Sequence, residues 1–235
     1  MIEIENLRFR YPRSDFLLDV PQLGIAAGEK VAIVGPSGCG KTTLLNLISG
    51  IVVPDSGSVI IDGSPVSSLP DSARRDFRIA EIGMVFQQFE LVEYLDVREN
   101  ILLPFLINSS LKLDSSVRSR AQALAQAMGM GDKLKRRSSR LSQGEQQRVA
   151  ISRALITQPK LMMADEPTGN LDPKNKLLIL DLIFKQAEQN NQTLVVVTHD
   201  MGILSDFDRT IDFEQFHVDA AEENGATTKS SGARP

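Results

Sequence analysis

Apolar residues along the chain follow two spacings that predict its strands. Residues 2–11 alternate between apolar and polar side chains, which is typical of a half-buried strand in an antiparallel sheet. A turn at residues 54–57 precedes another short strand, Ser58–Asp62. Other short runs are continuously apolar, as in strands covered on both faces, and we expect buried strands at Lys30–Val34, Ile82–Phe86, Lys160–Ala164 and Thr193–Thr198.

Helical spacing of apolar residues predicts the remaining elements, which are Lys41–Ser49, Asp114–Met128, Gly144–Thr157 and Lys174–Gln189. Residues from about 95 to 157 lack strand patterns, so we expect a helical subdomain over about 88–157. The predicted class is α/β, with a mainly parallel core sheet, an N-terminal antiparallel β subdomain and this inserted helical subdomain. We expect one domain over residues 1–218. The polar stretch 219–235 is expected to be disordered.

The composition narrows the classes of protein to which the chain can belong. It has 30 acidic and 26 basic residues and a net charge of −4, which does not favour a nucleic-acid partner. The single cysteine, Cys39, excludes an internal disulfide and fits a reducing compartment. The first residues do not resemble a signal peptide, and every apolar run is shorter than the roughly 18–20 residues that span a bilayer. We therefore expect a cytoplasmic protein that reaches a membrane only through a partner.

A glycine-rich loop between a predicted strand and a predicted helix is the clearest chemical motif. Residues 35–42 match the phosphate-loop pattern G-x-x-x-x-G-K-[ST] without a mismatch. Its glycines let backbone N–H groups face phosphates, and the helix that follows presents its positive end to them. Lys41 suits the β- and γ-phosphates of ATP, and the Thr42 hydroxyl suits Mg²⁺. We expect ATP contacts from Gly35, Pro36, Ser37, Gly38, Cys39, Gly40, Lys41, Thr42 and Thr43.

Two adjacent carboxylates, Asp165 and Glu166, directly follow a buried strand. The carboxyl ends of such strands open into the cleft where α/β proteins bind ligands. We predict that Asp165 is a Mg²⁺ ligand and that Glu166 polarises the attacking water. The alternative is a solvated surface pair, against which the four preceding apolar residues argue.

Four further segments resemble motifs of the ATP-binding cassette (ABC) family. Gln87 resembles the glutamine of its Q-loop, and the Leu141–Arg148 segment resembles its signature motif. Residues 169–172 resemble the D-loop, and His199 resembles the switch histidine. Tyr11 stands where the family has an aromatic residue that stacks on adenine. The resemblance covers about residues 2–213.

This resemblance implies roles where local chemistry is ambiguous. Gln87 is implied to be a Mg²⁺ ligand and a sensor of the membrane subunit, and His199 to order the attacking water with Glu166. Ser142, Gln143 and Gly144 are implied to contact ATP held by a second cassette, and Asp172 of the D-loop is also implied to bind the nucleotide. A lone cassette would then hold half of each active site, so we expect a dimer, with a homodimer the simplest form. Locally, Ser142 fits an ordinary helix N-cap almost as well.

Two positions invite a second interpretation. The family usually has glycine where Gln143 stands, and a side chain there would change how this loop approaches the opposite nucleotide. Because Ser142 and Gly144 are retained, we expect activity to survive. Cys39 lies near a helix N-terminus, where a thiol can become reactive, but a small tolerated filler is the simpler interpretation.

The resemblance implies the ATP-hydrolysing subunit of an ABC transporter, which drives separate transmembrane permease subunits at the cytoplasmic face of the membrane. Residues 164–172 resemble the branch of lipoprotein-release, macrolide-efflux and cell-division ATPases. An amino-acid importer subunit is the alternative, followed by a soluble cassette that acts on nucleic acid or ribosomes. As a hypothesis, the Phe89–Asp96 segment, with Glu90 and Glu93, receives a helix of the permease. The substrate and the direction of transport are not specified by the sequence.

Overall fold

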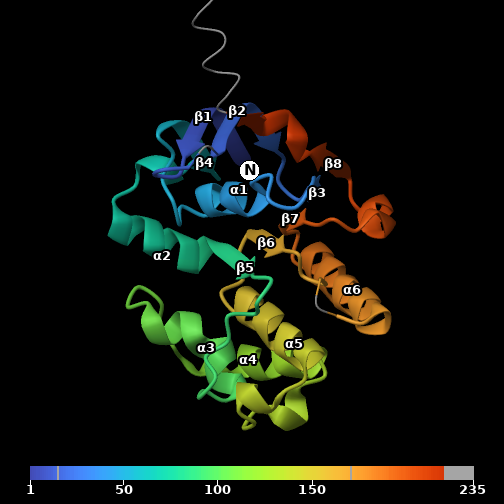
Figure 1. The fold of residues 1–235 in the computed structure, drawn as a ribbon. Helices are drawn as coiled ribbons and strands as arrows, with labels where there is room; N and C mark the ends of the chain where they lie inside the picture. The colour runs from blue at the N-terminus through green and yellow to red at the C-terminus, as the bar shows by residue number, and fades with distance from the viewer. Residues whose placement is uncertain (15, 170, 220–235) are drawn as a thin grey trace, which may run out of the picture.

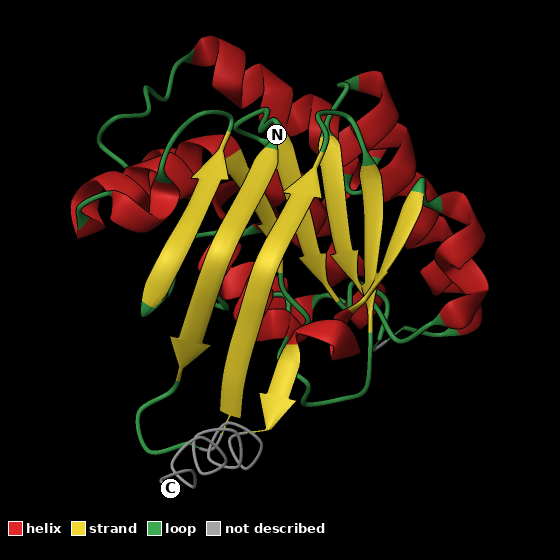
Figure 2. Ribbon diagram, turned by 90° about the horizontal axis from the view of Figure 1, so that it is seen from above, coloured by secondary structure: helices red, strands yellow, loops and turns green. Residues whose placement is uncertain are grey.

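Two sheets lie above a group of helices in the computed structural model, which describes residues 1–14, 16–169 and 171–219 (Figure 1). Viewed from above, the strands of the two sheets lie in adjacent layers with helices around them (Figure 2). The predicted α/β class is confirmed. The tail that we expected to be disordered lies, apart from its first residue, outside the described residues.

The first sheet is antiparallel, with strand order β4-β1-β2-β9. Its strands are β1 (Ile2–Arg10), β2 (Phe16–Ile25), β4 (Ser56–Ile61) and β9 (His217–Asp219). The alternation predicted for β1 is present, since its apolar side chains are buried and most of its polar ones are exposed. Pro21 and Gly24 interrupt the pattern of β2, which explains why the sequence did not predict this strand.

The second sheet is parallel, with strand order β5-β6-β7-β3-β8. Its strands are β3 (Lys30–Val34), β5 (Ile82–Val85), β6 (Leu161–Asp165), β7 (Thr193–Val197) and β8 (Arg209–Asp212). The four apolar runs are therefore strands, as predicted, with ends shifted by at most one residue. The short strand β8, which is mostly exposed, lacked an apolar run and was not predicted.

Two hydrophobic cores lie on opposite faces of the parallel sheet. Along β6, Leu161 and Met163 pack into one core, while Met162 and Ala164 pack into the other. The first core also contains residues of the antiparallel sheet and of α1 (Lys41–Ile48). The second contains residues of the helices below. Because successive side chains of a strand point to opposite faces, burial on both sides produces the continuous apolar runs seen in the sequence.

Three helices occupy the interval between β5 and β6: α3 (Val97–Ile107), α4 (Ser115–Ala127) and α5 (Gln143–Leu155). Helix α6 (Pro173–Gln189) connects β6 to β7. Helix α2 (Asp71–Glu81), which precedes β5, has no fully buried residue, and this polarity explains why it was not predicted. Short 3₁₀ helices occur at Val66–Ser68, Gly131–Lys133, Ser138–Arg140, Met201–Asp206 and Phe213–Phe216. None of the helices described here is long and apolar enough to cross a membrane.

Candidate functional site

The glycine-rich loop connects β3 to α1, in the strand–loop–helix context that the motif requires. Gly40, the N-cap of α1, has a φ of 108°, a conformation that residues with a side chain rarely adopt. A Cβ at this position would lie 2.5 Å from Cζ of Phe16, so a larger residue here would have to displace the Phe16 ring of β2. The antiparallel sheet therefore shapes the end of the phosphate loop.

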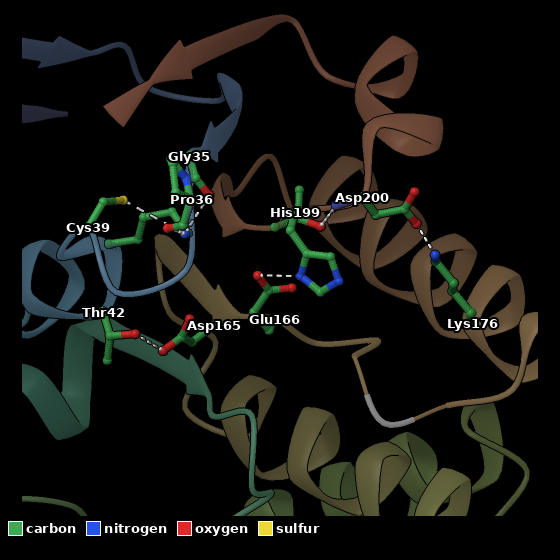
Figure 3. Close-up of polar contacts among 11 residues, drawn as sticks. Gly35, Pro36, Cys39, Thr42, Asp165, Glu166, Lys176, His199 and Asp200 are labelled. Atoms are coloured by element: carbon green, nitrogen blue, oxygen red, sulfur yellow. Dashed lines mark hydrogen bonds and ion pairs between the residues drawn. The ribbon is translucent and has the colours of Figure 1, made fainter. Parts of the chain in front are cut away.

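Lys41 is folded against its own loop. Its Nζ donates hydrogen bonds of 2.7 Å to the carbonyl oxygens of Gly35 and Pro36, and lies 3.8 Å from Sγ of Cys39. Lys41 is buried, and these carbonyls lie at the start of the loop (Figure 3). The ammonium group is thus held inside the loop by two carbonyl oxygens, where its positive charge would attract a phosphate anion.

Thr42 and Asp165 bring the loop and the end of β6 together. The Thr42 hydroxyl donates to Oδ2 of Asp165 at 2.7 Å (Figure 3). Burial raises the pKa of Asp165, and the neighbouring Glu166 raises it further, while the hydrogen bond from Thr42 opposes both effects. A carboxylate with this environment gains from a nearby cation, which would offset the repulsion from Glu166.

Glu166 and His199 form a second pair at the ends of β6 and β7. Oε1 of Glu166 lies 2.8 Å from Nδ1 of His199 (Figure 3). Glu166 has a φ of 47°, in the left-handed region, and its N–H donates to the carbonyl of Val197 at 3.0 Å. This backbone conformation costs about 1 kcal/mol or more. It turns the Glu166 side chain out of the strand direction and toward His199.

One cavity, here called the phosphate-loop cavity, gathers most of the predicted chemistry. It has a volume of about 600 Å³. It is lined by Ser37, Gly38, Gly40, Lys41, Thr42, Thr43, Gln87, Asp165, Glu166, Val197 and His199. All of these except Val197 were expected from the sequence to lie in the site. The structure therefore brings ten of the residues that the sequence analysis expected in the site to the lining of one cavity.

Four other predicted contacts lie beside this cavity and not in its lining. Gly35 supplies a carbonyl to Lys41, and Pro36 and Cys39 line a smaller cavity with Glu214. The Tyr11 hydroxyl lies 3.3 Å from Oγ1 of Thr43, and the Tyr11 ring is about one-third exposed. The Tyr11 ring lies 4.7 Å from the ring of Phe9 in an edge-on contact and 6.1 Å from that of Phe16.

The signature residues lie away from the cavity, at the N-terminus of α5. Ser142 is the N-cap: Oγ of Ser142 accepts from the N–H of Glu145 at 3.4 Å, and Oε2 of Glu145 accepts from the N–H of Ser142 at 2.8 Å. The N-cap interpretation is therefore correct for this chain by itself. Ser142 and Gln143 are exposed and Gly144 is half-buried.

Asp172 of the predicted D-loop also acts locally. Its carboxylate accepts from the N–H of Asn175 at 3.1 Å and from the Asn175 amide at 2.6 Å. The Asn175 side chain in turn lies 3.4 Å from where a Cβ of Gly144 would be. The structure thus links the D-loop to the signature segment within one chain, while Asn170 lies outside the described residues.

Two arrangements around the site were not predicted. An ion pair joins Lys176 on α6 to Asp200, the residue after His199 (Figure 3). Arg153 on α5 donates to the backbone of the loop that follows Gln87. Each joins residues more than 20 positions apart, so local patterns do not predict the pairing.

Comparison with known proteins identifies this arrangement of motifs. A family model described as ABC transporter matches residues 18–169. The chain belongs to the ABC transporter family. It is 41% identical over 207 residues to the lipoprotein-releasing system ATP-binding protein LolD of Pseudomonas fluorescens, covering 88% of this chain and 90% of the relative. It is 42% identical to LolD of Pseudomonas syringae pv. tomato, covering 86% and 88%.

Solved structures of ABC cassettes have the same fold. A dimeric ATP-binding cassette in a post-hydrolysis state with ADP and Pi has a TM-score of 0.82 at 33% identity, covering 94% of this chain and 99% of that one. A cassette of an ABC transporter complex from Clostridium perfringens has a TM-score of 0.79 at 26% identity, covering 96% and 91%. This ABC chain is thus an ATPase subunit of a transporter, as the resemblance implied, and the cassette fold is confirmed.

Proposed function

We propose that this ABC subunit drives a membrane complex of the lipoprotein-release type. The similarity to two lipoprotein-releasing ATPases over 86–88% of the chain supports this branch. The same relatives make the importer alternative less favoured. In such a complex, ATP hydrolysis supplies conformational work to the permease, and the permease selects the substrate.

The residues of the phosphate-loop cavity fit ATP with Mg²⁺. The Thr42 hydroxyl and the Asp165 carboxylate are hard oxygen donors 2.7 Å apart, and Gln87 adds an amide oxygen to the same lining. Mg²⁺ in such sites typically takes one or two carboxylates together with phosphate oxygens, whose charge it neutralises. Thr42, Asp165 and Gln87 are thus proposed to hold the metal.

Glu166 and His199 are proposed to prepare the attacking water. With one carboxylate oxygen next to His199, the other oxygen of Glu166 is available to accept a proton from water. His199 is about 70% exposed in its side chain, so its second ring nitrogen can reach a γ-phosphate in the cavity. Lys41 would exchange its contacts with loop carbonyls for phosphate oxygens when ATP binds.

A second copy of the chain is proposed to complete each site. Ser142, Gln143 and Gly144 lie outside the phosphate-loop cavity, yet Ser142 and the N-terminus of α5 offer a hydroxyl and N–H groups suited to an anion. The dimeric cassettes found in the structure comparison support this assembly. We take residues 1–218 as the catalytic unit of each copy, with the helical subdomain at about 88–157, and we propose Tyr11 as the stacking partner of adenine.

An apolar groove of about 210 Å³ between α2, β5, α3 and α5 is proposed to receive the permease. Its lining is mainly apolar, with charges from Arg78, Glu90 and Arg153. Glu90 therefore fits the hypothesis made from the sequence, whereas Glu93 is exposed and is not part of the lining. Through this contact the chain would sit at the cytoplasmic face of the cell membrane.

Reconstitution tests this function. The chain is co-purified with its permease subunits, placed in liposomes with a bound lipoprotein, and assayed for ATP-dependent release to an acceptor. We expect release by the wild type, none by Glu166→Gln, and reduced release by Glu90→Lys with ATP hydrolysis retained. Glu93→Lys is the matched control. Amino-acid uptake in place of lipoprotein release would favour the importer alternative.

A further inference from the structure

Arg153 on α5 holds the backbone of the loop that follows Gln87. Its Nη2 donates to the carbonyl oxygen of Phe89 at 2.7 Å, and its Nη1 donates to the carbonyl oxygen of Glu90. The side chain is half-buried, and burial lowers the pKa of its guanidinium to about 10, so the group remains charged at neutral pH. Two charge-assisted hydrogen bonds therefore join the signature helix to this loop.

The two accepting residues have an unusual backbone conformation. Phe89 has a φ of 60° and Glu90 a φ of 47°, two consecutive left-handed residues that carry side chains. Such a conformation persists only where its surroundings hold it. Hydrogen bonds within the loop contribute, from the N–H of Phe89 to the carbonyl of Phe86 and from the N–H of Glu90 to that of Gln88. Arg153 adds a contact from a different element, 63 or 64 positions away in the sequence.

Direct backbone contact fixes α5 to the strand that leads into this loop. Gly83 of β5 has no room for a side chain, because a Cβ there would lie 2.5 Å from the carbonyl oxygen of Ala154. Ala154 is the neighbour of Arg153 on α5. The distance between Arg153 and the end of β5 is therefore set by main-chain atoms, and the loop after β5 must adapt to it.

Helix α5 also contacts the segment that follows Glu166. The side chain of Gln147 is fully buried, and its Nε2 donates to the carbonyl of Pro167 at 2.7 Å. Pro167 directly follows Glu166. Helix α5 thus contacts two of the segments that line the cavity, those of Gln87 and Glu166, and it carries Ser142 at its N-terminus.

We propose that Arg153 is a positioning residue for ATP hydrolysis, which holds residues 87–90 in the turn that places Gln87 in the phosphate-loop cavity and ties Gln87 to the movement of α5. Gln87 lines that cavity, whereas Arg153 and Glu90 line the apolar groove. The contact of Arg153 with residues 89 and 90 therefore links the apolar groove to the segment that enters the phosphate-loop cavity. The inference rests on the proposed role of Gln87 in hydrolysis.

A double-mutant cycle on the full chain tests the inference, with MgATP hydrolysis as the readout. We expect Arg153→Met to lower kcat about 10-fold while the KM for ATP changes less than twofold. Arg153→Lys should lower kcat about threefold. Because Arg153 acts through Gln87, adding Arg153→Met to Gln87→Ala should lower kcat no further. Arg120→Met is the matched control, since Arg120 is also half-buried and donates to Gln158 in the helical part; its kcat should equal that of the wild type.

Hydrogen exchange separates positioning from a general loss of stability. In Arg153→Met, amides of residues 86–95 should exchange faster, while those of β3 and β6 keep their wild-type rates.

A wild-type kcat for Arg153→Met, or a double variant about 10-fold slower than Gln87→Ala, would overturn the inference. A wild-type kcat for Gln87→Ala would overturn the role of Gln87 and the inference with it. A slow Gln87→Ala beside an unaffected Arg153→Met would overturn the inference alone. If Arg153→Met folds poorly, Arg153→Lys takes its place in the cycle.

Discussion

Nδ1 of His199 lies 2.8 Å from Oε1 of Glu166, although the two residues are 33 positions apart. They follow the neighbouring parallel strands β7 and β6, and the N–H of Glu166 is bonded to the last residue of β7. The parallel register thus brings the two side chains together. Such fixed positions are what the proposed activation of water by this pair requires.

Glu166→Gln should remove the proton acceptor while keeping the shape of the site. We expect kcat for ATP hydrolysis to fall by about 10²–10⁴-fold, with ATP binding retained, because general-base catalysis contributes on that order. A dimer that holds ATP should then accumulate, detectable by size-exclusion chromatography with MgATP. Glu3→Gln, an exposed position on β1, is the control and should stay monomeric and active. Hydrolysis at the wild-type rate in Glu166→Gln would refute the assignment of Glu166.

His199→Ala removes the partner that orients Glu166. We expect kcat to fall by about 100-fold, comparable to the loss of one preorganised donor, with little change in the KM for ATP. In the Glu166→Gln background the same change should cost less, since the two residues act on one water. Steady-state kinetics of the four proteins measures this coupling. Independent, multiplicative losses would show that His199 acts without Glu166.

Asp165→Asn should stabilise the protein while abolishing hydrolysis. Burial raises the pKa of Asp165 above its ordinary value of 3.8, so the folded chain binds this proton more tightly than the unfolded chain. Stability from this group is therefore greatest at low pH and declines as the pH rises through the raised pKa. Without nucleotide or Mg²⁺ at pH 7, we expect the Tm of Asp165→Asn to exceed that of the wild type, because an uncharged amide avoids the cost of a partly buried carboxylate beside Glu166. The gain should shrink as the pH approaches 3.8, and a lower Tm at pH 7 would contradict this account.

Local motifs explain why so much of the site could be predicted from the sequence. The phosphate loop carries its chemistry within eight residues, and Asp165 and Glu166 are recognised by the apolar strand before them. The contacts that depend on packing could not be predicted. Arg153 reaches carbonyls 63 and 64 positions away, and its role is set by the backbone contact at Gly83. Likewise, the N-cap geometry of Ser142 is local, whereas its proposed contact with ATP requires a second chain.

Gly40→Ala should damage the phosphate loop more than an equivalent change elsewhere. Its φ of 108° and the 2.5 Å approach of Phe16 to a new Cβ together force the loop or β2 to move. Gly63→Ala is the matched control, because Gly63 also has a positive φ, of 79°, but open space around its Cβ position. We expect Gly63→Ala to cost about 1–2 kcal/mol from backbone strain alone and to bind ATP normally. For Gly40→Ala, we expect ATP affinity measured by calorimetry to fall at least 10-fold and the Tm to fall further than in Gly63→Ala. Adding Phe16→Leu should restore part of both losses, because the new Cβ clashes with the Phe16 ring. Equal losses in the two glycine variants, or no recovery with Phe16→Leu, would show that φ alone matters at Gly40.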